Sequence, residues 1–386
     1  MIKKNHFILT LIVIMVPFFC FTQEEESLKI IHGPYLQNVT ESGATILFST
    51  NKLVVPGVLI RSGKDDFELV QNSHDGLIDV GDNLHKVRIE NLQPGESFDY
   101  RLYACEILNY RPYEVTYGDT IISQTYSFKT FYPDKKKINF TVFCDLHDKP
   151  GKLIKYLESN TVDQQDCYFF NGDIMGHLEE DEQLFHSFID PSVETFASKI
   201  PFFYVRGNHE TRGQFARELK DYLDLSDDVY YYAQTIGTIR FIVLDGGEDK
   251  PDSTKAYSGL VDFDYYRLEE LKWLKKELKS DEFKTATHKV VIIHMPVLKS
   301  ERNWYGMAFL AEHFGPVLQE AGIDLMISGH THRNAWIQAD KSGFGYPIII
   351  SSNNHFVEAE AGADGIFLKL KDLDGKVVSE YDLKND

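Results

Sequence analysis

Residues 323–332, IDLMISGHTH, join an apolar run to a glycine and two histidines that are one residue apart. A short apolar run that stops at a turn residue is typical of a buried strand. Gly329 allows backbone angles that other residues rarely adopt, so the chain can turn as it leaves the strand. The stretch therefore predicts a strand whose end presents the imidazoles of His330 and His332 to one place.

Four earlier apolar runs end in a similar way. INFTVFC, CYFFN, PFFYVR and KVVII are each followed by side chains that can bind a metal. Helical patterns lie between such runs, as in residues 267–278, where leucines recur at three- and four-residue intervals. The alternation predicts an α/β layered domain over residues 138–372. Ligands of such domains bind beyond the carboxyl ends of the strands, so we expect the side chains that follow the runs to meet at one rim.

The side chains at this rim share one chemistry. Carboxylate and amide oxygens together with neutral imidazoles suit zinc, iron, manganese or nickel, whereas magnesium and calcium prefer oxygen ligands alone. They are too many for one ion and fit two transition-metal ions that share a carboxylate, an arrangement that supports hydrolysis at phosphorus. The candidate ligands are Asp145, His147, Asp173, Asn208, His294, His330 and His332.

Residues 28–130 have a different pattern. The short alternating runs ATILFST, GVLIRSG, HKVRIENL, FDYRLYA and YSFKT are separated by turn residues, which predicts an antiparallel β-sandwich. The segments GPYLQNVTESGATILFSTN and NLQPGESFDYRL resemble a fibronectin type III domain of the kind that precedes the catalytic domain of purple acid phosphatases. Phe98 stands where such domains often carry a corner tyrosine. We expect the tyrosines of YRPYEVTYGD to pack within a hairpin.

The ordered motifs DLH, NGD, GNHE, IIH and GHTH resemble the signature of the calcineurin-like metallophosphoesterases. With the sandwich, they resemble secreted enzymes of the purple acid phosphatase type, whose catalytic domain has a β-sandwich core flanked by helices. The resemblance implies a bridging role for Asp173 and an acid or electrostatic role for His209 at the leaving oxygen. It implies a first metal held by Asp145, His147, Asp173 and His332, and a second held by Asp173, Asn208, His294 and His330.

One position departs from the purple acid phosphatases. Those enzymes usually carry a metal-binding tyrosine three residues after the bridging aspartate, and here that residue is Gly176. His147 occupies a position that the other metallophosphoesterases use. We therefore expect an imidazole in place of a phenolate at the first metal, with neither purple colour nor ferric iron assumed.

The resemblance implies hydrolysis of phosphate monoesters, with in-line attack at phosphorus by a water that two cations activate. A phosphodiesterase or nucleotidase on the same scaffold is the alternative, and a non-catalytic secreted binding protein is a further one. Loops at 245–258 and 301–307 are expected to shape the pocket. His177 and His355 are candidate substrate residues, with surface placement as the alternative.

Charge and the N-terminus limit the partners and the location. The formal net charge of −19, from 59 acidic and 40 basic residues, argues against nucleic acid as a partner, whereas a small phosphorylated substrate is allowed because bound cations reverse the local field.

Residues 1–22 read as a signal peptide, which predicts export to a periplasm or the exterior; a short membrane anchor or a lipid on Cys20 is the alternative. No second apolar run approaches the length of a membrane span. Three other cysteines, Cys105, Cys144 and Cys167, are expected to be free thiols.

Overall fold

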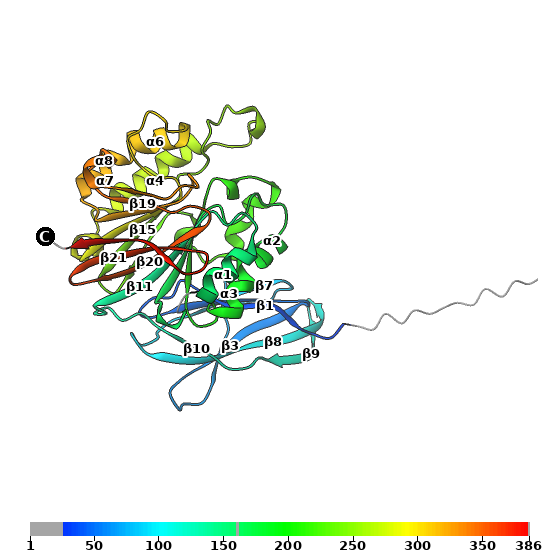
Figure 1. Ribbon diagram of the computed structural model, residues 1–386. Helices are drawn as coiled ribbons and strands as arrows, with labels where there is room; N and C mark the ends of the chain where they lie inside the picture. The colour runs from blue at the N-terminus through cyan, green and yellow to red at the C-terminus, as the bar shows by residue number, and fades with distance from the viewer. Residues whose placement is uncertain (1–25, 160–161, 385–386) are drawn as a thin grey trace, which may run out of the picture.

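The computed structural model describes residues 26–159 and 162–384, which form a smaller all-β part and a larger part with helices (Figure 1). The predicted signal peptide at 1–22 lies outside the described residues. Among the described residues, no helix is both long and apolar enough to cross a membrane. Cys105, Cys144 and Cys167 are free thiols, as predicted.

The all-β part contains two antiparallel sheets. The first has the strand order β1-β2-β7, and the second has the order β10-β8-β3-β4 with β9 also paired to β8. The strands are β1 (Ile30–Gln37), β2 (Ala44–Thr50), β3 (Val54–Ser62), β4 (Glu68–Val70), β7 (Leu84–Ile89), β8 (Ser97–Arg111), β9 (Glu114–Ile122) and β10 (Tyr126–Lys129), with a small β5 (Ser73–His74) and β6 (Leu77–Ile78) pair. Residues of β7 alternate between buried and half-buried, as expected for a strand with one face in a core.

The larger part contains two six-stranded sheets. Their strand orders are β13-β12-β11-β20-β21-β22 and β14-β15-β16-β17-β19-β18. The strands are β11 (Lys137–Phe143), β12 (Cys167–Asn171), β13 (Phe202–Val205), β14 (Tyr232–Ile236), β15 (Ile239–Leu244), β16 (His288–Ile293), β17 (Leu325–Ser328), β18 (Ala335–Ile337), β19 (Ile348–Ile350), β20 (His355–Gly362), β21 (Gly365–Asp372) and β22 (Val377–Lys384). The sheet thus continues past residue 372 through β22, which pairs with β21.

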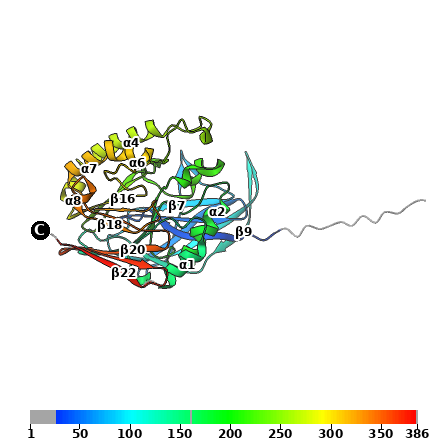
Figure 2. The ribbon, with the colours of Figure 1, turned by 45° about the horizontal axis from the view of Figure 1, so that its top comes forward.

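The two sheets pack face to face between helices. Phe140 and Phe241 meet in the layer between the sheets, with ring centroids 5.0 Å apart. Figure 2 shows α4, α6 and α7 over one outer face and α1 on the opposite side. The helices are α1 (Pro150–Ser159), α2 (Glu182–Leu184), α3 (Asp190–Thr195), α4 (Phe263–Glu277), α5 (Asp281–Thr285), α6 (Tyr305–His313), α7 (Gly315–Ala321) and α8 (Ala339–Ser342). The predicted α/β architecture, a β-sandwich core flanked by helices, is confirmed.

The two parts are joined by buried hydrogen bonds. The hydroxyl of Tyr35 donates to the carbonyl of Tyr222 at 2.9 Å, and the hydroxyl of Tyr100 donates to the carbonyl of Ser198 at 2.8 Å. Every residue of β2 is buried, because one face lies in the sandwich core and the other faces the larger part. The sandwich is therefore fixed against the larger part.

The structure corrects one expectation about the sandwich. The YRPYEVTYGD segment does form a hairpin, with Arg111 opposite Glu114. Its tyrosines, however, do not pack: Tyr110, Tyr113 and Tyr117 are 64%, 103% and 60% exposed. The second strand of the hairpin, β9, is exposed along most of its length, so these rings have little to pack against.

Candidate metal centre

The candidate ligands follow the ends of β11, β12, β13, β16 and β17, where the backbone turns sharply. Asp145, His147, Asp173, His330 and His332 all have positive φ angles, between 49° and 69°. Non-glycine residues seldom adopt this left-handed conformation, and it concentrates at functional sites where surrounding contacts enforce it. The unusual backbone turns side chains from both sheets toward one another.

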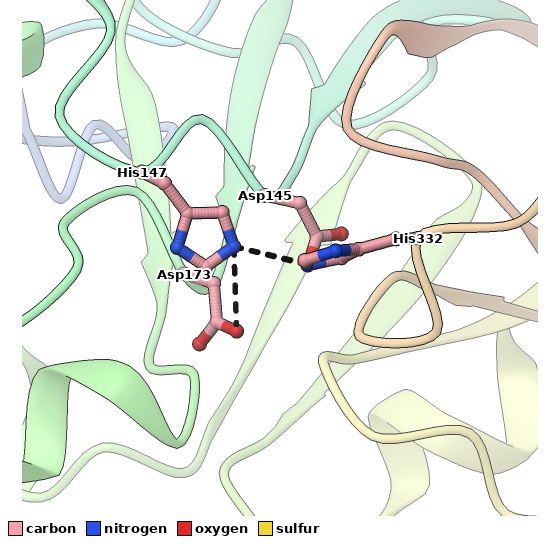
Figure 3. Close-up of side chains that lie close together, drawn as sticks. All are labelled: Asp145, His147, Asp173 and His332. Carbon is pink, nitrogen blue, oxygen red and sulfur yellow. Dashed lines mark hydrogen bonds and ion pairs between the residues drawn. The ribbon is translucent and has the colours of Figure 1, made fainter.

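The first group contains Asp145, His147, Asp173 and His332, whose ligand atoms all lie within 4.8 Å of one another. The Nε2 atoms of His147 and His332 are 3.0 Å apart, and His147 Nε2 lies 4.0 Å from Asp173 Oδ2 (Figure 3). His332 Nε2 lies 3.2 Å from Asp145 Oδ1. These distances bring the four predicted first-metal ligands around one point.

The second group contains Asp173, His294 and His330, again with ligand atoms within 4.8 Å. His294 Nε2 lies 3.1 Å from Asp173 Oδ2. Asn208 joins this group through its Oδ1 atom, which is 2.9 Å from His330 Nδ1. Asp173 belongs to both groups, which is the geometry that a bridging carboxylate requires.

The donor atoms of this cluster fit transition-metal ions. Asp145 Oδ1, His294 Nε2 and His330 Nε2 are buried and make no well-aligned hydrogen bond within the described residues. Buried polar atoms normally have a hydrogen-bond partner. Three such atoms that converge without one therefore indicate that a binding partner is missing. Mixed imidazole and carboxylate donors favour zinc, iron, manganese or nickel as that partner.

Carbonyl groups fix the orientation of two histidine rings. His294 Nδ1 lies 2.8 Å from the carbonyl oxygen of Asn171, and His209 Nδ1 lies 2.7 Å from that of Gly176. A carbonyl oxygen can only accept, so each Nδ1 carries the hydrogen and each Nε2 faces the cluster. His209 Nε2 is 3.9 Å from Asp173 Oδ2, and His209 belongs to neither ligand group.

Burial favours the neutral form of the imidazoles, whereas nearby carboxylates favour the protonated form. Burial lowers the pKa of His330 to about 3 and also lowers the pKa of His147. Burial opposes protonation of His294 as well, but the Asp173 and Asp145 carboxylates raise its pKa to about 10. His147 and His330 are thus neutral at neutral pH, as metal binding would require, whereas a metal would have to displace a proton from His294.

Glu210 supports the cluster and was not singled out from the sequence, although it ends the quoted GNHE motif. Its fully buried carboxylate accepts hydrogen bonds from four backbone N–H groups. The donors and their distances are Asp173 at 3.0 Å, Ile174 at 2.6 Å, Met175 at 3.1 Å and Gly207 at 2.9 Å. Burial and the Asp173 carboxylate raise the pKa of Glu210 to about 7, against the effect of these donors. Glu210 therefore ties the turn after β12 to the turn after β13.

Glycines make room for the ligands. A Cβ atom on Gly207 would lie 2.3 Å from both the backbone nitrogen and Oδ1 of Asp173. A Cβ atom on Gly172 would lie 2.6 Å from the His294 ring, and Gly172 also has a φ of 75°. The close approach of the strand ends thus requires residues without a side chain at both positions.

The two candidate substrate residues lie outside both ligand groups. The His177 side chain is 54% exposed, with Nε2 3.5 Å from Glu179. His355 is half-buried, and its Nδ1 lies 2.8 Å from the hydroxyl of Ser352. A role for either residue in binding substrate stays a prediction.

A family model described as calcineurin-like phosphoesterase matches residues 138–334, just over half of the 386-residue chain. The chain belongs to the calcineurin-like phosphoesterase family. The match spans every candidate ligand and His209, and it confirms the family resemblance that the ordered motifs indicated. Membership places the chain among the metal-dependent phosphoesterases.

Relatives of this phosphoesterase extend the likeness to the sandwich. Purple acid phosphatase 21 of Arabidopsis thaliana is 24% identical over 262 residues, which are 64% of this chain and 52% of that protein. The chain therefore aligns with about half the length of that curated relative. The fold resembles purple acid phosphatase PPD1 from yellow lupin (Lupinus luteus) seeds, with a TM-score of 0.69, 14% identity, and coverage of 92% of this chain and 74% of that one.

A second solved structure, that of PhoD, gives a TM-score of 0.62 at 12% identity, and the match covers 91% of this chain and 90% of that chain. At these identities the likeness shows a shared fold. Because both matches cover more than nine-tenths of this chain, the shared fold includes the N-terminal strands together with the α/β part.

Proposed function

We propose that this protein is an exported hydrolase of small phosphate monoesters that uses two transition-metal ions. The observation that carries the proposal is the presence of Asp173 in two separate groups of ligand atoms, each within 4.8 Å. Family membership supports phosphoester chemistry. The Arabidopsis relative is a purple acid phosphatase by name, which supports the choice of monoesters.

The residue roles follow from the two groups. Asp173 would bridge two ions, with the first held also by Asp145, His147 and His332, and the second held also by Asn208, His294 and His330. When bound, such a pair of ions lowers the pKa of a coordinated water and neutralises charge on the phosphoryl oxygens.

His209 is proposed as the general acid. Its Nδ1–H is held by the Gly176 carbonyl, which leaves Nε2 pointing toward the cluster from outside both ligand groups. A protonated Nε2 there could deliver a proton to the oxygen that leaves phosphorus, or stabilise its charge. The side chain is 30% exposed, so it can exchange that proton with solvent between turnovers.

The test compares 4-nitrophenyl phosphate with bis(4-nitrophenyl) phosphate, using metal-replete protein before and after chelation. We expect faster turnover of the monoester, loss of activity on chelation and recovery when metal is restored. Faster turnover of the diester would replace the proposal by the phosphodiesterase alternative. Absence of both activities in metal-replete protein would favour a non-catalytic binding protein.

A variant tests the bridging role separately. Asp173→Ala removes the carboxylate common to both groups, so we expect both ions to be depleted together. Full occupancy of both sites in folded Asp173→Ala, measured by elemental analysis, would contradict the assignment.

Export is tested by fractionating cells that express the full chain and sequencing the N-terminus of the mature protein. Cleavage within or just after residues 1–22 and recovery outside the cytoplasm are expected. An intact N-terminus on protein that stays in the cytoplasm would contradict export.

A further inference from the structure

The ligand cluster is open to solvent on one side. His294 is completely buried, and His330 is only 6% exposed. By contrast, the side chains of His332, His209 and His147 are 45%, 30% and 18% exposed. A phosphoryl group must approach from the side of these exposed imidazoles, and its organic substituent must then lie along the rim around them.

Trp304 lies next to the ligand cluster, against His330. Its ring centroid is 5.0 Å from that of His330, and the two rings are nearly perpendicular, at 81°. Trp304 nevertheless remains 56% exposed. Trp304 therefore contacts a candidate ligand in a perpendicular ring arrangement and leaves more than half of its surface exposed next to the cluster.

The loop that carries Trp304 is firmly held. The carbonyl of Trp304 accepts a hydrogen bond from Ala308 N at 2.8 Å, which starts α6. The next residue, Tyr305, donates from its hydroxyl to Asp264 Oδ2 at 2.6 Å, and Gly306 N donates to the carbonyl of Asp249 at 2.9 Å. An exposed aromatic ring on a fixed backbone is already in place for stacking, so binding costs little ordering of the protein.

The neighbouring loop at 245–258 is fixed as well. The guanidinium of Arg267 is fully buried and donates to the carbonyls of Gly246 and Glu248. A Cβ atom on Gly306 would lie 2.6 Å from the Glu248 carbonyl, so the two loops are in close contact. The two predicted pocket loops thus form one rigid support for Trp304.

We infer that Trp304 determines specificity by stacking on the organic group of the substrate, and that the preferred esters carry a planar aromatic group next to the phosphate. This inference rests on the proposed function, because it assumes that a phosphoryl group binds at the cluster. Indole is the largest aromatic side chain, and stacking or edge contacts between aromatic rings add affinity beyond simple burial. A methyl substituent cannot make such a contact.

Calorimetry with two non-hydrolysable probes, phenylphosphonate and methylphosphonate, tests the inference on the metal-replete full chain. We expect the wild type to bind phenylphosphonate about tenfold more tightly than methylphosphonate. Trp304→Ala should abolish this preference without changing the Kd for methylphosphonate or the metal content. Trp304→Phe should keep part of the preference.

Two controls separate specificity from a general effect. Tyr113→Ala removes an aromatic side chain that is 103% exposed on the β8–β9 hairpin, and it should behave as the wild type. Quenching of tryptophan fluorescence by 4-nitrophenylphosphonate gives a second measure of binding next to Trp304, because the chain has only three tryptophans. The quenched signal should be absent from Trp304→Phe and present in a Trp336→Phe control.

Equal affinity of the wild type for the two phosphonates, or binding of neither, would overturn the inference, as would an equal loss of both affinities in Trp304→Ala. Failure of the proposed function has a different signature. In that case phosphonates bind with the expected preference, but metal-replete protein turns over no phosphoester.

Discussion

His209 has its ring oriented by a carbonyl group at Nδ1, as His294 does, but His209 belongs to neither ligand group. Nδ1 is engaged by the carbonyl of Gly176, and Nε2 stands 3.9 Å from Asp173 Oδ2. Its backbone N–H donates to Asp173 Oδ1 at 3.0 Å, so the main chain supports the shared carboxylate while the side chain stays outside both ligand groups. The main chain and the side chain of this residue can therefore be tested separately.

His209→Ala removes the side chain and keeps the backbone hydrogen bond. We expect kcat for an aryl phosphate to fall about 10²- to 10⁴-fold, the usual contribution of a positioned acid. Metal content should stay near that of the wild type, as measured by elemental analysis. A parallel loss of metal and activity would mean that His209 is a ligand or a structural residue.

Glu210→Gln tests the support beneath the ligands. An amide can accept with one oxygen only, and its NH₂ group would face backbone donors that the second carboxylate oxygen now satisfies. We expect a loss of about 1–3 kcal/mol in the free energy of unfolding, measured by chemical denaturation. An unchanged denaturation midpoint would show that these hydrogen bonds contribute nothing net.

The convergence of the candidate ligands could be predicted from the sequence because each follows an apolar run, and the order of motifs is visible along the chain. Glu210 and Trp304 could not be assigned in the same way. The role of Glu210 depends on N–H groups more than thirty residues earlier, at Asp173, Ile174 and Met175. The role of Trp304 depends on its distance from His330, which only the folded chain establishes.

At the scale of secondary structure, the strand ends position the site. The predicted run ATILFST matches β2 residue for residue, and the alternation of Ala44, Ile46 and Phe48 with other residues is the period-two pattern of a strand. Two other strands of the sandwich carry weaker signals. β1 contains Gly33 and Pro34, which are unusual inside strands, and its pairing with β2 shifts register there. β9 is exposed along most of its length and has little apolar alternation.

Gly207→Ala tests the close approach of the turns after β12 and β13. The added methyl group would lie 2.3 Å from two atoms of Asp173, so the shared carboxylate must move. We expect loss of both ions and of activity, measured by elemental analysis and by hydrolysis of an aryl phosphate. Gly151→Ala is the matched control, because nothing lies within 4 Å of the added atom there.

A variant Gly207→Ala with normal metal content would show that the turns can separate without disturbing the ligands. Loss of metal in Gly151→Ala would point instead to a general sensitivity of the fold, because Gly151 lies in α1 and an added Cβ atom there meets no atom within 4 Å.

At the scale of the whole molecule, the sandwich is a fixed part of the structure. Its β1 contacts residues far along the chain, as in the hydrogen bonds from Tyr35 to Tyr222 and from Gln37 to Phe202. The sequence predicted two domains but not this docking, because the contacts join residues more than a hundred positions apart. No local pattern records which partner a buried tyrosine hydroxyl will find.

The sandwich also contains a pH-sensitive group. His85 in β7 is 3% exposed, and its Nε2 lies 2.8 Å from the hydroxyl of Thr50. Burial lowers the pKa of His85 to about 4, below the ordinary value of about 6.5 that applies in the unfolded chain. The folded state thus prefers neutral His85, and its contribution is complete above about pH 6.5 and is lost as the pH falls toward about 4.

As the pH falls from about 6.5 to about 4, we expect protonation of His85 alone to lower the free energy of unfolding by about 3 kcal/mol. His85→Gln, which keeps a partner for Thr50 but does not titrate, should remove that part of the pH dependence. Urea denaturation at a series of pH values measures both proteins. Identical pH dependence of the wild type and His85→Gln would contradict the assignment.

The most direct test of the account is the number of metal ions bound per chain. Folded protein is saturated with zinc, manganese or iron, freed of excess metal by dialysis and measured by elemental analysis against protein concentration. We expect two ions per chain, because Asp173 belongs to two ligand groups. A saturating stoichiometry of one ion, or of none, would contradict it.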